Sequence, residues 1–186
     1  MIAFKYKQIL ILRLSIINSK FERMNDVMAV FDSYDNYYDR AMKAYCSNKK
    51  IDPKNINDEQ NEIIIERSCV HIGFYLAWII NNNMEGDMHK EYNSENLEKV
   101  RREEMTGVDF FLTCCDGKLW SDDFNDEGLA FTEYYYASEE FMKDYVDFVF
   151  NELYDIPCEF DFDWKDYKKF EVILDRRFEA FGKKEK

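Results

Sequence analysis

His71 is the residue whose type and setting could most readily support acid–base chemistry. It begins the apolar run HIGFYLAWII at residues 71–80, and an imidazole beside a carboxylate such as Asp116 or Glu127 can act as a general base. A histidine on an apolar helix is more often a buried hydrogen-bonding residue. The sequence contains no G-x-S-x-G, no phosphate-binding glycine loop and no H-E-x-x-H. We therefore assign no catalytic residue, and a hydrolase-like enzyme using His71 remains the alternative function.

Metal-binding patterns are equally sparse. The chain has five cysteines and two histidines, His71 and His89, without a C-x-x-C motif. Cys69 and His71 stand two positions apart, but core packing is the simpler explanation for a free cysteine. The acidic run at 122–127 resembles a calcium loop, yet its glycine is out of register for an EF-hand. No metal and no cofactor is predicted. The odd number of cysteines favours a reducing compartment, and hence the cytoplasm.

Acidic charge is the most distinctive property of the chain. The net charge is −13, and residues 121–166 carry fifteen Asp or Glu against Lys143 and Lys165. Such a surface repels nucleic acid and anionic membranes, and it attracts basic proteins. Tyrosines among carboxylates can anchor a partner inside a charged rim. The predicted partner-binding residues are Asp122, Asp123, Asp126, Glu127, Tyr134, Glu139, Glu140, Asp144 and Asp147.

The first 23 residues differ from the rest of the chain. They are basic, and their apolar run is interrupted by Arg13. The run is too short to span a membrane, and no A-x-A cleavage site follows it. We interpret residues 1–23 as an extension upstream of a true start at Met24. Residues 24–186 then form one domain, since no linker or repeat divides them, and nothing in the sequence sets an oligomeric state.

Helices must position these side chains. Six Gly and two Pro are too few for the turns of an all-β domain. The pattern predicts a single compact, mainly α domain of about six helices. Its strongest helix covers 62–82 and is apolar on nearly all sides, which is typical of a central helix. Gly73 within it indicates close approach of another backbone. Alternation near residues 155–162 allows a short β element.

Four motifs carry a resemblance to a known family. The chain resembles a bacterial domain of unknown function whose members share an HIGxFLAW helix, a T-G-x-x-F…C-D-G-K segment, a D-x-N-x-E-G-x-x-F helix and a terminal LDRRF. These motifs stand here at residues 71–78, 106–118, 123–131 and 174–178. The motif residues to which we give structural roles are His71, Gly73, Trp78, Asp116, Gly117 and Gly128.

The resemblance also implies a class of function. Members of that family occur among genes of polymorphic toxin systems, as immunity proteins do. Together with the acidic charge, this leads us to expect a non-catalytic, cytoplasmic protein that neutralises a cognate toxin by binding it. The expected partner is a basic protein, and neither nucleic acid nor a membrane is expected. A structural domain whose acidic surface serves only solubility is a further alternative.

Overall fold

The computed structural model describes residues 28–184, and the expected mainly α architecture is confirmed. The predicted extension at 1–23 and the predicted start at Met24 lie outside the described residues. The described part has nine α-helices rather than about six, because several are only six to eight residues long. In chain order the elements are β1 (Val30–Ser33), α2 (Asp35–Lys49), η1 (Pro53–Asn55), α3 (Asp58–Ser68), α4 (Val70–Asn81), α5 (Asp87–Tyr92), α6 (Ser94–Arg101), α7 (Gly107–Cys114), β2 (Lys118–Trp120), η2 (Ser121–Asp123), α8 (Asp126–Phe131), η3 (Thr132–Tyr136), α9 (Glu140–Phe148), η4 (Val149–Leu153) and α10 (Trp164–Lys184).

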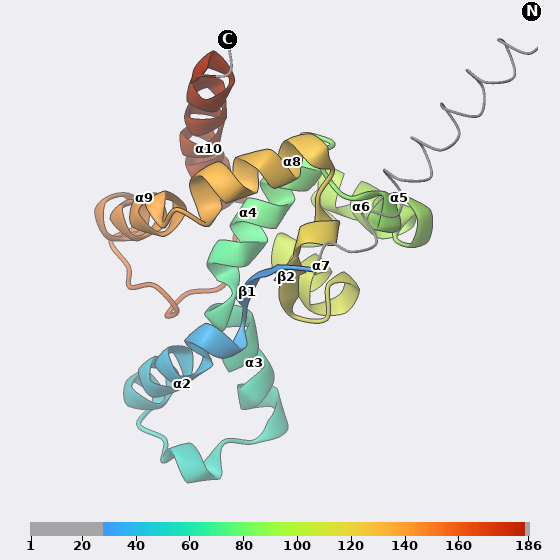
Figure 1. Cartoon of the computed structure of the whole chain (residues 1–186). Helices are drawn as coiled ribbons and strands as arrows, with labels where there is room; N and C mark the ends of the chain where they lie inside the picture. Colours follow the sequence, from blue (N-terminus) through green and yellow to red (C-terminus); the bar gives the residue numbers. More distant parts are fainter. Residues whose placement is uncertain (1–27, 185–186) are drawn as a thin grey trace, which may run out of the picture.

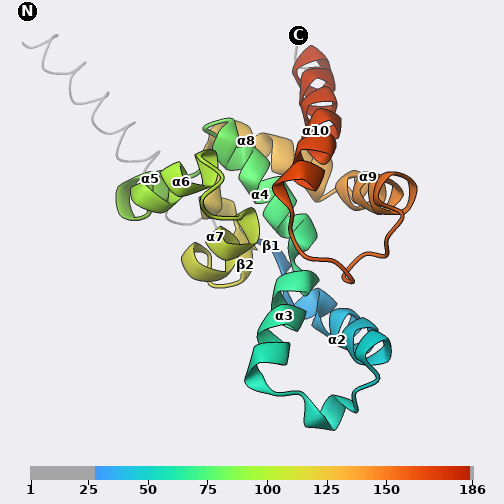
Figure 2. The ribbon, with the colours of Figure 1, turned by 180° about the vertical axis from the view of Figure 1, so that it is seen from behind.

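Helix α4 is the centre of the molecule. Every residue from Val70 to Ile80 is buried, and α6, α7 and α10 pack against it. Figures 1 and 2 show α4 between the α5–α7 group and the α9–α10 group. A helix that is apolar on every side is stable only inside a protein. The expectation that this run forms the central helix is therefore confirmed.

The sequence predicted a single helix over 62–82, and this prediction is wrong. The structure has two helices there, α3 and α4, with a bend of 59° between them. The Ser68 hydroxyl donates a 2.6 Å hydrogen bond to the Ile65 carbonyl, and the Cys69 thiol lies 3.3 Å from the same oxygen. The Cys69 amide bonds to Glu66 instead. Side chains that compete for a backbone acceptor in this way bend helices. Among the described residues, no single helix is long and apolar enough to cross a membrane, although this bent pair would be.

Two glycines let α4 and α7 approach closely. A Cβ on Gly73 would lie 2.7 Å from the amide nitrogen of Val108, and one on Gly107 would lie 2.0 Å from the carbonyl oxygen of Gly73. The close backbone approach expected at Gly73 is therefore present. Thr106 and Asp109 form a capping box that starts α7 at this contact.

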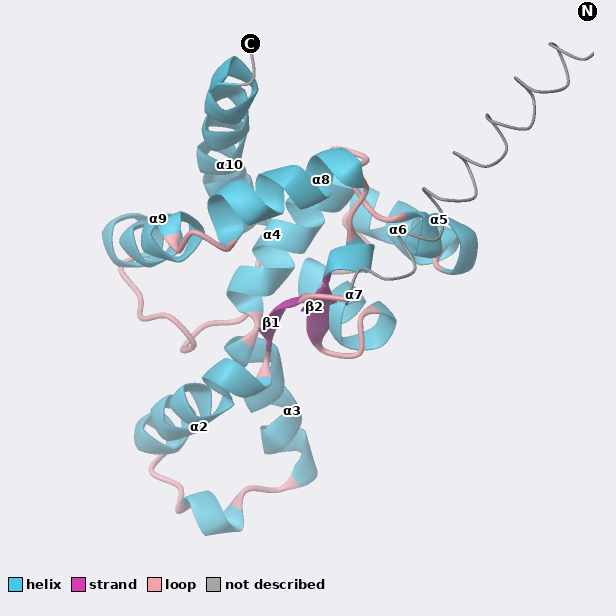
Figure 3. Ribbon diagram, in the orientation of Figure 1, coloured by secondary structure: helices cyan, strands magenta, loops and turns pink. Residues whose placement is uncertain are grey.

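The strands are not where the sequence analysis expected one. Residues 155–162 form turns and bends, so the β element allowed there is wrong. Instead β1 and β2 pair in antiparallel fashion (Figure 3). Their register is irregular between Val30 and Asp32. A bulge redirects side chains locally. Here both Asp32 and Ser33 are buried although they are consecutive.

The segment after α8 winds as a π-helix, η3. The wider turn places the consecutive residues Tyr135 and Tyr136 both in the interior. π-turns occur often at functional sites because they change the direction of side chains within a helix. Glu139, with φ at 67°, then turns the chain into α9.

Candidate functional site

A groove of about 600 Å³ lies between β1, the start of α2, the end of η3 and α9. Tyr37, Tyr136 and Phe141 contribute aromatic walls. Its lining contains three exposed charged residues, Glu139, Lys143 and Asp147, and one buried charged residue, Asp32. Three of these four charged groups are carboxylates, so the groove is anionic.

Asp32 is the most heavily hydrogen-bonded carboxylate of the groove. It is 5 % exposed, and its Oδ1 accepts hydrogen bonds from the Ser33 amide at 2.8 Å and Asn36 Nδ2 at 3.0 Å. Its Oδ2 accepts from the Tyr37 hydroxyl at 3.2 Å and the Tyr136 hydroxyl at 2.7 Å. A buried carboxylate is stable only with such a set of donors.

His71 lies beneath this carboxylate. Its Nε2 is 3.4 Å from Oδ2 of Asp32, within ion-pair distance, but it makes no hydrogen bond within residues 28–184. The imidazole is 2 % exposed and lies against the Tyr37 ring, with 4.2 Å between the ring centroids. Tyr145 covers it from another side at 5.7 Å. The histidine therefore supports the floor of the groove and is not part of its lining.

The electrostatics of the floor favour an ionised Asp32. Burial by itself would raise the pKa of this carboxyl, but the nearby His71 imidazole and the hydrogen bonds from Tyr136 and Asn36 hold the pKa below its usual value. Burial and the neighbouring carboxylate raise the pKa of the Tyr37 and Tyr136 hydroxyls, so both remain neutral donors. Asp32 is thus ionised at neutral pH.

The prediction that Asp116 or Glu127 is the carboxylate partner of His71 is wrong. Asp116 is exposed in the turn before β2, where it lines a separate hollow with Tyr34 and Glu62. Glu127 is exposed on α8 and faces the end of α10. Asp32 takes the place of both. No sequence motif joins it to His71, because a bulged strand and a helix bring the two together.

The expected partner-binding residues divide into buried and exposed sets. Asp123 is 1 % exposed and Asp144 is half-buried in an ion pair with Arg177 at 2.6 Å, so neither is an open surface carboxylate, contrary to expectation. Asp144 also accepts a hydrogen bond from Tyr135 at 2.8 Å. The exposed residues of the set are Asp122, Asp126, Glu127, Tyr134, Glu139, Glu140 and Asp147.

These exposed residues lie at several places, with Tyr134 against Phe181 and Glu140 paired with Arg177. Glu139 and Asp147 line the groove described above. Asp126 and Glu127 line a second hollow, of about 720 Å³, against the C-terminal part of α10. Asp122 borders a small cavity beside β2. Of these three locations, only the first is lined by a buried carboxylate that accepts hydrogen bonds from two tyrosine hydroxyls.

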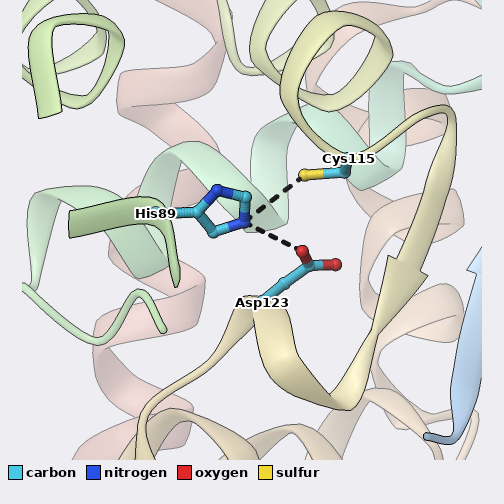
Figure 4. A group of neighbouring side chains, drawn as sticks. All are labelled: His89, Cys115 and Asp123. Atoms are coloured by element: carbon cyan, nitrogen blue, oxygen red, sulfur yellow. Dashed lines mark hydrogen bonds and ion pairs between the residues drawn. The ribbon is translucent and has the colours of Figure 1, made fainter. Parts of the chain in front are cut away.

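A second cluster of chemically capable side chains lies on the other side of α4. Figure 4 shows His89 of α5, Cys115 at the end of α7 and Asp123 of η2 pointing toward one another. His89 Nε2 is 2.8 Å from Asp123 Oδ1 and 3.8 Å from Cys115 Sγ. All three residues are buried, and their ligand atoms lie within 4.8 Å of one another.

The surroundings hold this cluster in place. Asn93 lies 3.1 Å from Nδ1 of His89, and the Trp120 amide donates a 2.6 Å hydrogen bond to Oδ2 of Asp123. Burial, with the charge of Asp123, raises the pKa of the Cys115 thiol well above its usual value. A thiol with a raised pKa is a poor nucleophile. The geometry therefore gives a buried polar cluster and no reactive thiol.

Sequence reasoning missed this cluster because its members come from three separate segments. Metal motifs are recognised by short spacings, such as two ligands on one turn, and none is present here. The sequence offered one signal. The chain has only two histidines, and His89 is the one that contacts both a cysteine and a carboxylate.

The other motif residues shape the backbone. Trp78 Nε1 donates a 2.8 Å hydrogen bond to Asp175, which ties α4 to α10. Gly117 has φ at 66°, the left-handed value expected for the residue that ends α7, and Asp116 before it has φ at 53°. Gly128 allows α8 to pack on the backbone that follows α4.

The profile of a family described as a domain of unknown function, DUF7832, matches residues 30–159. The chain belongs to this family. The DUF7832 match includes the groove and the His89 cluster, but it ends before α10, so the motif at 174–178 lies outside it. No curated protein and no solved structure matches the chain.

Proposed function

We propose that this DUF7832 protein is a non-catalytic interaction protein of immunity type, which binds a basic toxin domain through the groove lined by Tyr37, Tyr136, Glu139 and Asp147. The observation that carries the proposal is the fixed negative charge of Asp32 on the floor of an aromatic, acid-rimmed groove. An arginine or lysine side chain is the chemical complement of such a groove.

The floor and the rim have different roles in this interaction. Both oxygens of Asp32 already accept hydrogen bonds, so this residue attracts a cation through its field alone. Glu139 and Asp147 are exposed, and their carboxylates make no hydrogen bond or ion pair within residues 28–184. They can accept hydrogen bonds from a guanidinium or an ammonium group.

The charge of the whole chain supports the same partner class. A net charge of −13 speeds the encounter with a basic protein and opposes nucleic acid and anionic membranes. All five cysteines are free. Free thiols are usual in a reducing compartment, which supports a cytoplasmic location for the complex.

The test is binding to the toxin domain encoded beside this chain in its own genome. Purified chain and an inactive form of that domain are titrated at low and moderate salt, and the chain is coexpressed with the active domain. We expect a complex that protects cells and weakens as salt screens the rim charges. Reversal of both rim charges, Glu139→Lys with Asp147→Lys, should weaken the complex by at least about tenfold.

The matched control reverses two acids in the second hollow, Asp126→Lys with Glu127→Lys. It makes the same change in net charge at a different place, so it should alter affinity by no more than about threefold. Equal losses in both double variants would mean that net charge, not the groove, drives binding. Absence of both complex and protection with the unaltered chain would overturn the proposal.

A further inference from the structure

Three donors of different chemistry meet inside the protein at the His89 cluster. An imidazole nitrogen, a thiol sulfur and a carboxylate oxygen come from α5, the end of α7 and η2 (Figure 4). Each residue is at most 4 % exposed. None of the three lines the groove on the other side of α4.

Two of the distances are within about half an ångström of those in a tetrahedral zinc site. With usual zinc–ligand bond lengths, a bound nitrogen and oxygen are about 3.3 Å apart, and a bound nitrogen and sulfur about 3.6 Å. Here the nitrogen–oxygen distance is 2.8 Å and the nitrogen–sulfur distance is 3.8 Å. An ion can thus enter when the carboxylate moves by about half an ångström.

Charge favours a divalent cation. Within the described residues, His89 is the one basic side chain paired with Asp123, which is otherwise buried. A carboxylate and a thiolate together carry two negative charges, which a divalent ion neutralises, and the thiol proton leaves as the ion binds. A thiolate ligand disfavours Mg²⁺ and Ca²⁺, whereas zinc accepts all three donor types.

A neighbouring group already orients the carboxylate donor. The Trp120 amide holds one oxygen of Asp123 and leaves the other toward His89. The Asn93 amide nitrogen lies 3.1 Å from Nδ1 of His89. A turn of this amide by about 180° would bring its oxygen to the ring, where it would accept the Nδ1 proton and leave the lone pair of Nε2 for an ion.

A cavity beside two of the donors leaves room for a fourth ligand. A cavity of about 200 Å³ borders both Cys115 and Asp123, and Asp122 also lines it. A water molecule occupies only about 30 Å³. The cavity therefore has room for a water ligand, which completes a tetrahedral set.

We propose that His89, Cys115 and Asp123 bind a zinc ion, with water as the fourth ligand, and that the ion joins α5 to the segment running from α7 through β2 to η2. The site is independent of the groove and of the proposed immunity role. Its contribution is to the stability of this half of the protein.

The test uses the whole chain, freed of metal with a chelator and then titrated with Zn²⁺ or Co²⁺ alone. Zinc should bind with one-to-one stoichiometry and raise the melting temperature. Cobalt should give the visible bands of a tetrahedral site together with a thiolate charge-transfer band. Neither readout depends on any activity, and the unaltered chain suffices, so a variant that fails to fold does not prevent a decision.

Two neighbouring cysteines provide the matched pair of variants. Cys115→Ser should abolish the thiolate band, whereas Cys114→Ser, which changes the next residue, should retain it. Asn93→Ala should weaken zinc binding by about 10- to 100-fold. No zinc-induced stabilisation and no thiolate band in the unaltered chain would show a metal-free hydrogen-bond network instead. A band that survives in Cys115→Ser would equally overturn the site.

Discussion

The Tyr136 hydroxyl donates a 2.7 Å hydrogen bond to the Asp32 carboxylate, although the two residues lie 104 positions apart in the chain. The bond joins the bulged strand β1 to the π-turn η3, and it does so at the floor of the groove. Two irregular backbone features are thus fixed to each other by one buried polar contact.

Replacing Tyr136 with phenylalanine should lower the free energy of unfolding by about 1–3 kcal/mol, because a buried carboxylate oxygen loses a donor. Tyr37→Phe removes a longer bond, of 3.2 Å, to the same oxygen from a half-buried ring, so its effect should be smaller. Urea unfolding of both variants measures the difference. An unchanged free energy of unfolding in Tyr136→Phe would mean that the contact adds nothing to stability.

Asp32→Asn should destabilise the protein at neutral pH by about 3 kcal/mol, since it removes the charge that faces His71 and the two hydroxyls. The pKa of Asp32 is lowered in the folded state, so its stabilising effect is present above the usual aspartate pKa of about 3.9 and is lost as pH falls through the folded value.

Unfolding free energies of both proteins, measured from about pH 7 down to about pH 3, check this prediction. The gap between the unaltered chain and Asp32→Asn should narrow toward the acid end. A gap of constant size would show that packing, not ionisation, accounts for the loss.

Gly107→Ala should destabilise the protein by about 1–3 kcal/mol or more, because its Cβ would lie 2.0 Å from the Gly73 carbonyl and would push α7 away from α4. Gly182→Ala on α10 is the control. Its Cβ meets no atom within 4 Å, and alanine favours a helix over glycine by up to about 1 kcal/mol. In thermal denaturation, the melting temperature should therefore fall for Gly107→Ala and rise for Gly182→Ala.

Phe170→Ala should cost about 3–5 kcal/mol, because this ring is fully buried between α4 and α9. Val172, on the same helix, is 65 % exposed, so Val172→Ala should change stability by no more than about 0.5 kcal/mol. Chemical denaturation distinguishes the two. Similar effects at both positions would mean that α10 does not dock on the core as described.

Much of the fold could be predicted because it depends on local patterns. The apolar run at 71–80 could only be a central helix, and the left-handed turn at Gly117 follows from glycine's conformational freedom. The bend at Cys69 could not be predicted, since it depends on which carbonyl the Ser68 hydroxyl reaches. The strands were missed because each is only three or four residues long.

The candidate sites were less predictable because they depend on contacts between distant segments. Sequence spacing identified His71, but it could not show that Asp32, rather than Asp116 or Glu127, lies beside it. Composition likewise does not distinguish a buried carboxylate from an exposed one in an acidic region. Asp123 looked like its exposed neighbours, yet its hydrogen bonds to His89 and Trp120 place it in the interior.

The position of α10 has a practical consequence for work on this family. The family match stops at residue 159, whereas the α10 residues Phe170 and Leu174 are fully buried and Trp78 of α4 bonds to Asp175. A recombinant fragment trimmed to the matched boundaries would leave one side of the central helix exposed to water and prone to aggregation. Expression boundaries should therefore extend through α10.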